Sequence, residues 1–149
     1  GENGAGKSTL MNVLIDTSVW SLVLRRATPS NDPHTLALRR LIDELRATII
    51  GPIRQELLSG ISKPAQYDAL RRRLRHFPDL LLDVADYERA AEFHNVCRRN
   101  GVQGSNTDFL ICAVAVGRDL AIFTTDRDYE RYQAHIPLTL YRLREADRQ

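Results

Sequence analysis

The stretch that most constrains the fold is Val13-Leu14-Ile15-Asp16-Thr17-Ser18, in which three aliphatic residues run straight into an acid and two hydroxyl residues. An unbroken aliphatic run predicts a strand that is buried on both faces, as in parallel sheets. The polar residues after it then lie at the carboxyl end of the strand, where open α/β sheets hold their ligands. Asp16 is therefore either the cap of the next helix or an acid delivered to a functional site.

Short apolar runs alternate with segments of helical periodicity along the rest of the chain. Further strands are predicted at 48–50, 80–82, 121–123 and 138–141, and helices at 19–26, 34–45, 53–58, 64–77, 86–99, 108–116 and 128–134. This alternation predicts an α/β fold: a three-layer sandwich with a mostly parallel central sheet of about five short strands and helices on both faces.

Local signals predict where several of these helices begin and end. Gly60 is expected to close one helix, and Asp86 to cap a long helix that Asn100-Gly101 closes. Asn106 or Thr107 is expected to cap the next helix. The charged tail after Arg142 is expected to be frayed.

Composition narrows the class of protein. A chain of 149 residues with 43% hydrophobic and 27% charged residues suits one globular domain. It contains no apolar run long enough to span a bilayer and no secretory signal pattern, which predicts a cytoplasmic protein with no membrane partner. Cys97 and Cys112 lack metal-ligand spacing and are interpreted as reduced core residues. A net charge of +2 does not by itself indicate a nucleic-acid binder.

Residues 1–8 match the P-loop pattern G-x-x-x-x-G-K-[ST] and resemble the phosphate loop of transporter-type ATPases. A working P-loop needs a strand before it and a full helix after it, and the run from Val13 leaves room for about one helical turn. Met11 looks like a natural start. We therefore interpret residues 1–10 as a non-native or tag-like segment, and residues 11–149 as a single domain.

Four acids interrupt otherwise apolar settings: Asp16, Glu56, Asp108 and Asp126. Three of them lie at strand ends or helix starts, where loops gather at the carboxyl edge of the sheet. Carboxylates that converge repel one another unless a divalent cation neutralises them. Ligation by oxygen atoms alone, with positions left for water, is what Mg²⁺ or Mn²⁺ prefers.

At these acids the chain resembles the PIN-domain ribonucleases, and within them the VapC-type toxins of bacterial toxin–antitoxin pairs. The resemblance runs from Met11 to about Tyr141 and depends on four segments in order: VLIDTSVW at 13–20, IRQELLSG at 53–60, TDFLICAVA at 107–115 and IFTTDRDY at 122–129. Cys112, where alanine is common, is a small departure from the family.

The resemblance implies a metal-dependent endoribonuclease that hydrolyses RNA phosphodiester bonds, leaving a 5′-phosphate and a 3′-hydroxyl. Structured RNA such as tRNA is the implied substrate and inhibition of translation the implied effect. The implied catalytic and metal ligands for one or two Mg²⁺ or Mn²⁺ ions are Asp16, Glu56, Asp108 and Asp126, with Thr17, Thr125 and Asp128 as accessory candidates. The implied partners are a VapB-like antitoxin and a second copy of the chain in a homodimer.

Two further features bear on partners. Arginine clusters at Arg25-Arg26, Arg39-Arg40, Arg71, Arg72, Arg73, Arg75, Arg98 and Arg99 either form solvated helix faces or hold RNA backbone. Trp20, Leu22 and Leu24 of the first helix either face the core or line a groove for an antitoxin helix.

Other interpretations remain open at this level. Glu56 could be a surface acid, Asp108 a helix cap and Asp126 a turn residue. The chain could instead be a P-loop nucleotide-binding fragment, a non-catalytic Rossmann-like binding module with structural acids, or a DNA nuclease of related architecture.

Overall fold

The computed structural model describes residues 11–24 and 31–148, so the P-loop-like segment and Arg25-Arg26 lie outside the described residues. Strands and helices alternate along the chain, as the sequence predicts. The elements are β1 (Val13–Ile15), α2 (Thr17–Leu24), α3 (Pro33–Asp43), β2 (Ala47–Ile50), α4 (Gly51–Leu58), α5 (Pro64–Leu74), β3 (Asp79–Leu80), α6 (Val84–Arg99), α7 (Asn106–Gly117), β4 (Ala121–Phe123), α8 (Asp128–Gln133) and a 3₁₀ helix, η1 (Glu145–Arg148).

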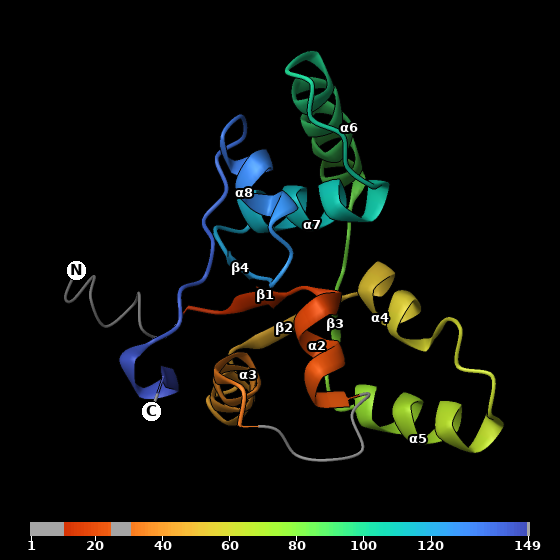
Figure 1. The fold of residues 1–149 in the computed structure, drawn as a ribbon. Coiled ribbons are helices and arrows are strands. Elements are labelled where there is room, and N and C mark those ends of the chain that lie inside the picture. The colour runs from red at the N-terminus through yellow and green to blue at the C-terminus, as the bar shows by residue number, and fades with distance from the viewer. Residues whose placement is uncertain (1–10, 25–30, 149) are drawn as a thin grey trace.

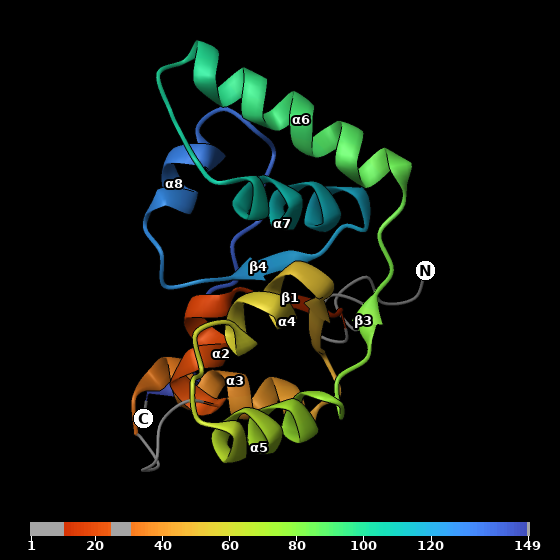
Figure 2. The same cartoon turned by 90° about the vertical axis from the view of Figure 1, so that its right-hand side faces the viewer.

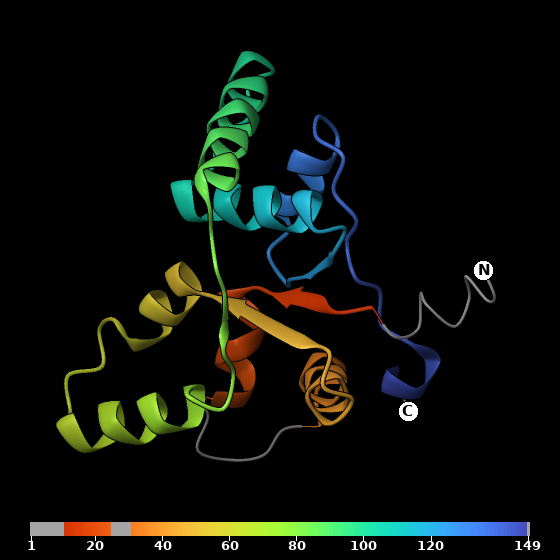
Figure 3. The ribbon, with the colours of Figure 1, turned by 180° about the vertical axis from the view of Figure 1, so that it is seen from behind.

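The strands form one parallel sheet in the order β3-β2-β1-β4 (Figure 1). β1 pairs with both β2 and β4, so it lies inside the sheet, and Leu14 and Ile15 are fully buried there. Helices α2, α3 and α5 cover one face and α6, α7 and α8 the other, which gives three layers (Figures 1 and 2). The α/β sandwich is confirmed. The view from behind shows β1 and β2 between the two layers of helices (Figure 3).

The fifth strand is a correction to the prediction. The segment predicted as a strand at 138–141 forms a single parallel bridge, between Leu140 and Ile122, so the sheet has four strands among the described residues. Two backbone hydrogen bonds fix it: Ile122 N–H donates to Thr139 over 2.8 Å and Tyr141 N–H donates to Ile122 over 2.7 Å. Pro137, just before the segment, has no N–H to extend the ladder.

The third strand is also shorter than predicted. β3 covers only Asp79–Leu80, and Leu81 is 85% exposed rather than buried. β3 is an edge strand that pairs only with β2, and natural sheets keep such edges short.

Helix caps lie one to three residues before the predicted positions. Asp83 caps α6, and Asp86 is the third residue of the helix. The two form a capping box, in which each side chain accepts a hydrogen bond from the other residue's backbone N–H. Ser105, rather than Asn106 or Thr107, caps α7 by accepting from Asp108 N–H over 3.0 Å. Gly60 has the positive φ of 85° that a terminating glycine needs, as predicted.

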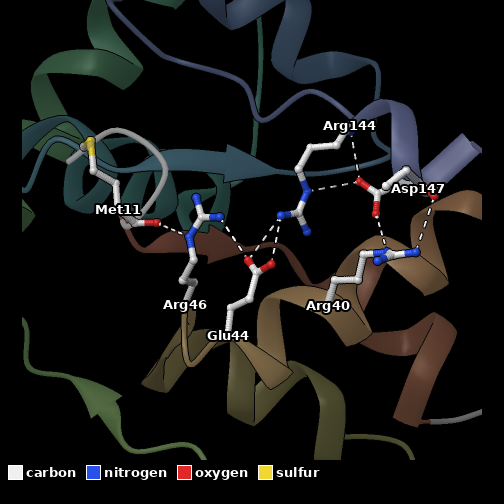
Figure 4. Close-up of polar contacts among 7 residues, drawn as sticks. Met11, Arg40, Glu44, Arg46, Arg144 and Asp147 are labelled. Atoms are coloured by element: carbon white, nitrogen blue, oxygen red, sulfur yellow. Dashed lines mark hydrogen bonds and ion pairs between the residues drawn. The ribbon is translucent and has the colours of Figure 1, made fainter. Parts of the chain in front are cut away.

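Residues 143–148 fold back onto α3, which corrects the expectation of fraying for this part of the tail. Its helix η1 lies against α3, and Asp147 is fully buried (Figure 4). The Asp147 carboxylate accepts from Arg144 N–H over 2.9 Å and lies 3.2 Å from Nε of Arg40. Glu44 at the end of α3 pairs with both Arg46 and Arg144. Charge in this tail therefore docks it, because Asp147 pairs with Arg40 of α3 and Arg144 pairs with Glu44 just after α3.

Side chains of α2 divide between the core and a groove. Trp20 is fully buried and its ring lies 4.8 Å from that of Phe77. Val23 and Leu24 instead line a mostly apolar pocket of about 760 Å³ with residues of α3, β2 and the α5–β3 connection. Cys97 and Cys112 are buried and free, as predicted.

Candidate acidic site

Asp16 follows β1 directly and is only 6% exposed. One carboxylate oxygen, Oδ1, accepts from Thr17 N–H over 2.8 Å at the start of α2. The other, Oδ2, accepts from the hydroxyls of Ser18 over 2.9 Å and Thr124 over 2.7 Å. Asp16 therefore helps to start the helix while its second oxygen faces the end of β4.

Burial raises the pKa of Asp16 above its usual value. Hydrogen bonds from Thr124 and Ser18 oppose the rise, and the negative charge of Asp108 adds to it. A buried acid with a like charge nearby is the arrangement that a cation relieves.

Two hydroxyls of this site, Ser18 and Thr124, are absent from the predicted site residues. Ser18 Oγ also accepts from Thr125 N–H over 3.2 Å, and Thr124 Oγ1 accepts from Asp126 N–H over 2.9 Å. The predicted accessory residue Thr125 thus contributes its backbone, and Thr124 contributes the hydroxyl that contacts Asp16. The pairing of β1 with β4 in register places these residues together.

Glu56 lies on α4 and is exposed. The Thr17 hydroxyl donates to Glu56 Oε1 over 3.1 Å, so this predicted accessory residue bridges α2 and α4. Partial burial raises the pKa of Glu56, and repulsion from Asp16 and Asp108 adds to the rise against the Thr17 hydrogen bond. A pocket of about 530 Å³ opens beside it, lined by Thr17, Pro52, Gln55, Glu56, Ser59 and Thr107.

Asp108 lies in the first turn of α7, but Ser105 is the residue that caps this helix. The Asp108 carboxylate instead accepts from two buried phenols of α8. Tyr129 donates to Oδ1 over 3.2 Å and Tyr132 donates to Oδ2 over 2.7 Å. Burial raises the pKa of both phenols, so each hydroxyl keeps the proton that it donates.

Asp126 lies in the turn between β4 and α8, and Asp128 is the first residue of α8. Asp126 is exposed, and its Oδ1 accepts from Asp128 N–H over 2.9 Å, which is a turn-forming contact. Asp128 pairs with Arg131 at 3.8 Å. The Thr124 hydroxyl donates to Asp16 and accepts from the backbone N–H of Asp126, so the link to Asp16 runs through the Asp126 backbone and not through its carboxylate.

The structure therefore brings Asp16, Glu56 and Asp108 close enough for their charges to interact, and joins Asp126 to them through Thr124. Within residues 11–24 and 31–148, no three His, Cys, Asp or Glu side chains are gathered so as to hold a metal ion. The donor set still fits Mg²⁺, because that ion is usually held by one or two carboxylates and several waters.

The predicted RNA-binding arginines do not form one surface. Arg71, Arg72, Arg73 and Arg75 belong to α5 or its end, whereas Arg98 and Arg99 end α6. These two helices lie at opposite ends of the molecule (Figures 1 and 2). Arg71 pairs with Asp68 at 3.3 Å, and Arg73 donates to the Leu24 carbonyl over 3.3 Å.

The fold and the site define an α/β protein whose acids collect at the carboxyl edge of a parallel sheet. The family model of the PIN domain matches residues 13–134, and the chain belongs to this family. The resemblance stated from the sequence is confirmed at this level. PIN domains are generally nucleases.

Solved structures share the fold over most of the chain. A chain in the crystal structure of FitAcB from Neisseria gonorrhoeae matches with a TM-score of 0.70 and 20% identity, covering 87% of this chain and 96% of that one. VapBC-1 from nontypeable Haemophilus influenzae matches with a TM-score of 0.69 and 14% identity, covering 88% and 97%. VapBC2 from Rickettsia felis, bound to a DNA fragment from their promoter, matches with a TM-score of 0.67 and 16% identity, covering 88% and 98%. No curated protein matches the chain.

No helix of the described residues is long and apolar enough to cross a membrane.

Proposed function

We propose that the chain is a VapC-type toxin that cleaves RNA with Mg²⁺ or Mn²⁺. The observation that carries the proposal is the buried Asp16, held at the sheet edge by two hydroxyls and facing the charges of Asp108 and Glu56. Starting α2 requires only one oxygen of Asp16, whereas burial of the whole carboxylate works against its ionised form. A cation that binds there offsets this cost.

Asp16 and Asp108 would hold the ion, with Glu56 and Asp126 as further ligands. A bound ion would polarise the scissile phosphate and lower the pKa of a bound water for in-line attack. Ser18 and Thr124 fix one oxygen of Asp16, and Thr17 fixes one oxygen of Glu56. The pocket beside Glu56 provides room for a nucleotide next to the acids.

The activity is tested by incubating total RNA with the protein in Mg²⁺ or Mn²⁺ and in EDTA. We expect cleavage only with the metal, and expect Asp16→Asn and Asp108→Asn to lower the rate at least 100-fold, as loss of a principal electrostatic group does. Glu92→Gln, an exposed acid of α6, is the matched control and should cleave like wild type. Cleavage in EDTA would contradict the metal mechanism. A wild type that leaves RNA intact would favour the non-catalytic binding module.

A second part of the proposal is that an antitoxin helix occupies the apolar pocket between α2, α3 and β3. Leu45 lines this pocket, is 88% exposed and has a φ of 58°. The left-handed φ belongs to the turn that ends α3, and it places an exposed aliphatic side chain at the edge of a mostly apolar pocket that a partner helix could cover.

Co-expression with the adjacent small gene tests the partner. The protein alone should arrest growth, and the partner should relieve the arrest. Leu45→Glu should weaken the complex at least tenfold without changing RNA cleavage, whereas Leu81→Glu, which is 85% exposed and does not line the pocket, should leave both unchanged. Normal growth under verified expression of folded protein would contradict the toxin assignment.

The finer features stay predictions of the same proposal: tRNA or another structured RNA as substrate, inhibition of translation, a homodimer and a cytoplasmic location. The exposed arginines Arg72, Arg75, Arg98 and Arg99 would hold RNA backbone. Because they lie on two separate helices, combined α5 and α6 variants test this role better than either alone.

A further inference from the structure

Two tyrosines of α8 hold the carboxylate of Asp108 at both of its oxygens. Tyr129 donates to Oδ1 over 3.2 Å and Tyr132 to Oδ2 over 2.7 Å, and both residues are fully buried. With both oxygens engaged from one helix, the carboxylate has one defined rotation about its last side-chain bond. Each oxygen keeps a second lone pair for another partner.

The rings that carry these hydroxyls are themselves fixed. Tyr129 and Tyr132 pack edge to face with centroids 5.2 Å apart, and Phe109 lies 5.0 Å from Tyr132. Tyr132 also lies against Gly104, where a Cβ would overlap the Tyr132 hydroxyl and come within 2.8 Å of its Cζ. Only glycine leaves this position open.

We propose that Tyr132 and Tyr129 are positioning residues that orient Asp108 for metal binding, and that Gly104 keeps Tyr132 in place. The proposal rests on the function proposed above. Groups that hydrogen-bond to metal ligands fix their orientation, and their loss typically costs 10- to 100-fold in metal affinity or activity. Neither tyrosine was identified from the sequence as part of the site.

The test uses the full chain, freed of metal, with Mn²⁺ alone as the probe in calorimetric titration. Tyr132→Phe removes one hydroxyl and keeps the ring, and we expect it to weaken Mn²⁺ binding about tenfold. Tyr129→Phe removes the longer hydrogen bond, so its effect should be smaller. Tyr141→Phe is the matched control: this hydroxyl is buried with no hydrogen-bond partner among the described residues, and its removal should leave Mn²⁺ affinity unchanged.

Gly104→Ala approaches the same contact without touching a phenol. It should displace the Tyr132 hydroxyl and weaken Mn²⁺ binding as Tyr132→Phe does. Tyr132→Phe should cleave RNA more slowly than wild type at limiting Mn²⁺, and its cleavage rate should recover as the Mn²⁺ concentration is raised. A role restricted to packing α8 on α7 would not give this recovery.

The outcomes separate this inference from the function beneath it. A wild type that binds no Mn²⁺ removes both. If the double variant Tyr129→Phe/Tyr132→Phe binds Mn²⁺ as tightly as wild type, only the positioning role is contradicted. If the double variant binds Mn²⁺ more tightly than wild type, the positioning role is also contradicted, because the phenols would then hold Asp108 away from the ion. Thermal melts accompany each variant, and affinity is compared at a temperature where all are folded.

Discussion

At the scale of single residues, Asp16 combines two demands that usually conflict. It is 6% exposed, which disfavours its charge, yet three hydrogen-bond donors favour that charge. Burial is the larger influence, and the pKa of Asp16 is raised. The metal-free fold therefore contains a carboxyl group that holds its proton more tightly than an ordinary aspartate does.

This raised pKa predicts a pH dependence of stability in the metal-free protein. The folded state binds the Asp16 proton more tightly than the unfolded chain, so the favourable contribution is complete below the unfolded value of 3.8. It is lost as pH rises through the folded pKa. We expect Asp16→Asn to be at least as stable as wild type at pH 7 in EDTA, and to lose this advantage below pH 4.

Urea unfolding of both proteins across this pH range checks the prediction. Added Mg²⁺ should stabilise wild type at pH 7 and leave Asp16→Asn unchanged. A variant that is markedly less stable at pH 7 in EDTA would mean that the hydrogen bonds to Asp16 outweigh its burial.

Sequence predicts site residues only where a local pattern marks them. Asp16 stands out because an acid ends an apolar run, and Thr17 because it follows that acid. Thr124 and Tyr132 carry no such signal, because a threonine after a strand and a tyrosine in a short helix are ordinary. Their roles depend on the register of β1 with β4 and on the packing of α8 over α7. The spacing of residues in the sequence specifies neither the register nor the packing.

At the scale of elements, one ion pair joins the start of α6 to the end of α7. Asp86 near the start of α6 is 2% exposed and accepts from Arg118, just after α7, over 2.8 and 3.0 Å. Arg118 also donates to the Leu81 carbonyl over 2.6 Å. The pair therefore fixes where α7 ends relative to α6, and with it the turn into β4.

We expect Asp86→Asn to lower the free energy of unfolding by about 2 kcal/mol at pH 7, since a hydrogen-bonded charge pair is lost. The Arg118 guanidinium holds the pKa of Asp86 below its usual value. The contribution is therefore complete above the unfolded value of 3.8 and is lost as pH falls through the folded pKa. The difference between variant and wild type should shrink from pH 5 to pH 3.

Asp68→Asn is the control for this measurement. It breaks an exposed pair with Arg71 three residues later in α5, and should change stability by less than about 0.5 kcal/mol. Equal effects of the two substitutions would contradict the structural role of Asp86.

Element type is predicted better than element ends. Among the described residues, hydrophobic runs and periodicity identify β1, β2, β4 and the α-helices, but not the 3₁₀ helix η1. Caps are misplaced because Asp83 and Asp86, or Ser105 and Asn106, are chemically equivalent candidates until the backbone geometry selects one. The prediction of a strand at 138–141 is wrong. An apolar run beside Pro137 can lie along β4 with two backbone hydrogen bonds and still form no continuous ladder.

At the scale of the whole molecule, the charged tail closes the structure by docking on α3. The sequence suggests a frayed end because high charge is typical of solvated tails. Asp147 instead lies fully buried against Arg40 and Arg144, with Glu44 beside them (Figure 4).

We expect Asp147→Ala to lower the free energy of unfolding by about 2 kcal/mol, because it removes the acceptor of charged and backbone donors. Glu145→Ala, exposed in the same 3₁₀ helix, should change it by less than about 0.5 kcal/mol. Chemical denaturation followed by Trp20 fluorescence reports both. Equal stability of the two variants would mean that the tail adds nothing to the fold.

The contact between Asp16 and Thr124 also has a consequence during synthesis. These residues lie 108 positions apart, and Asp16 accepts its shortest hydrogen bond across that interval. While a ribosome is still translating the intervening segment, β4 does not exist and the acidic edge has no second side. A nascent chain that has not yet reached Thr124 would therefore lack the complete acidic edge, and the proposed activity would require synthesis of the chain through β4.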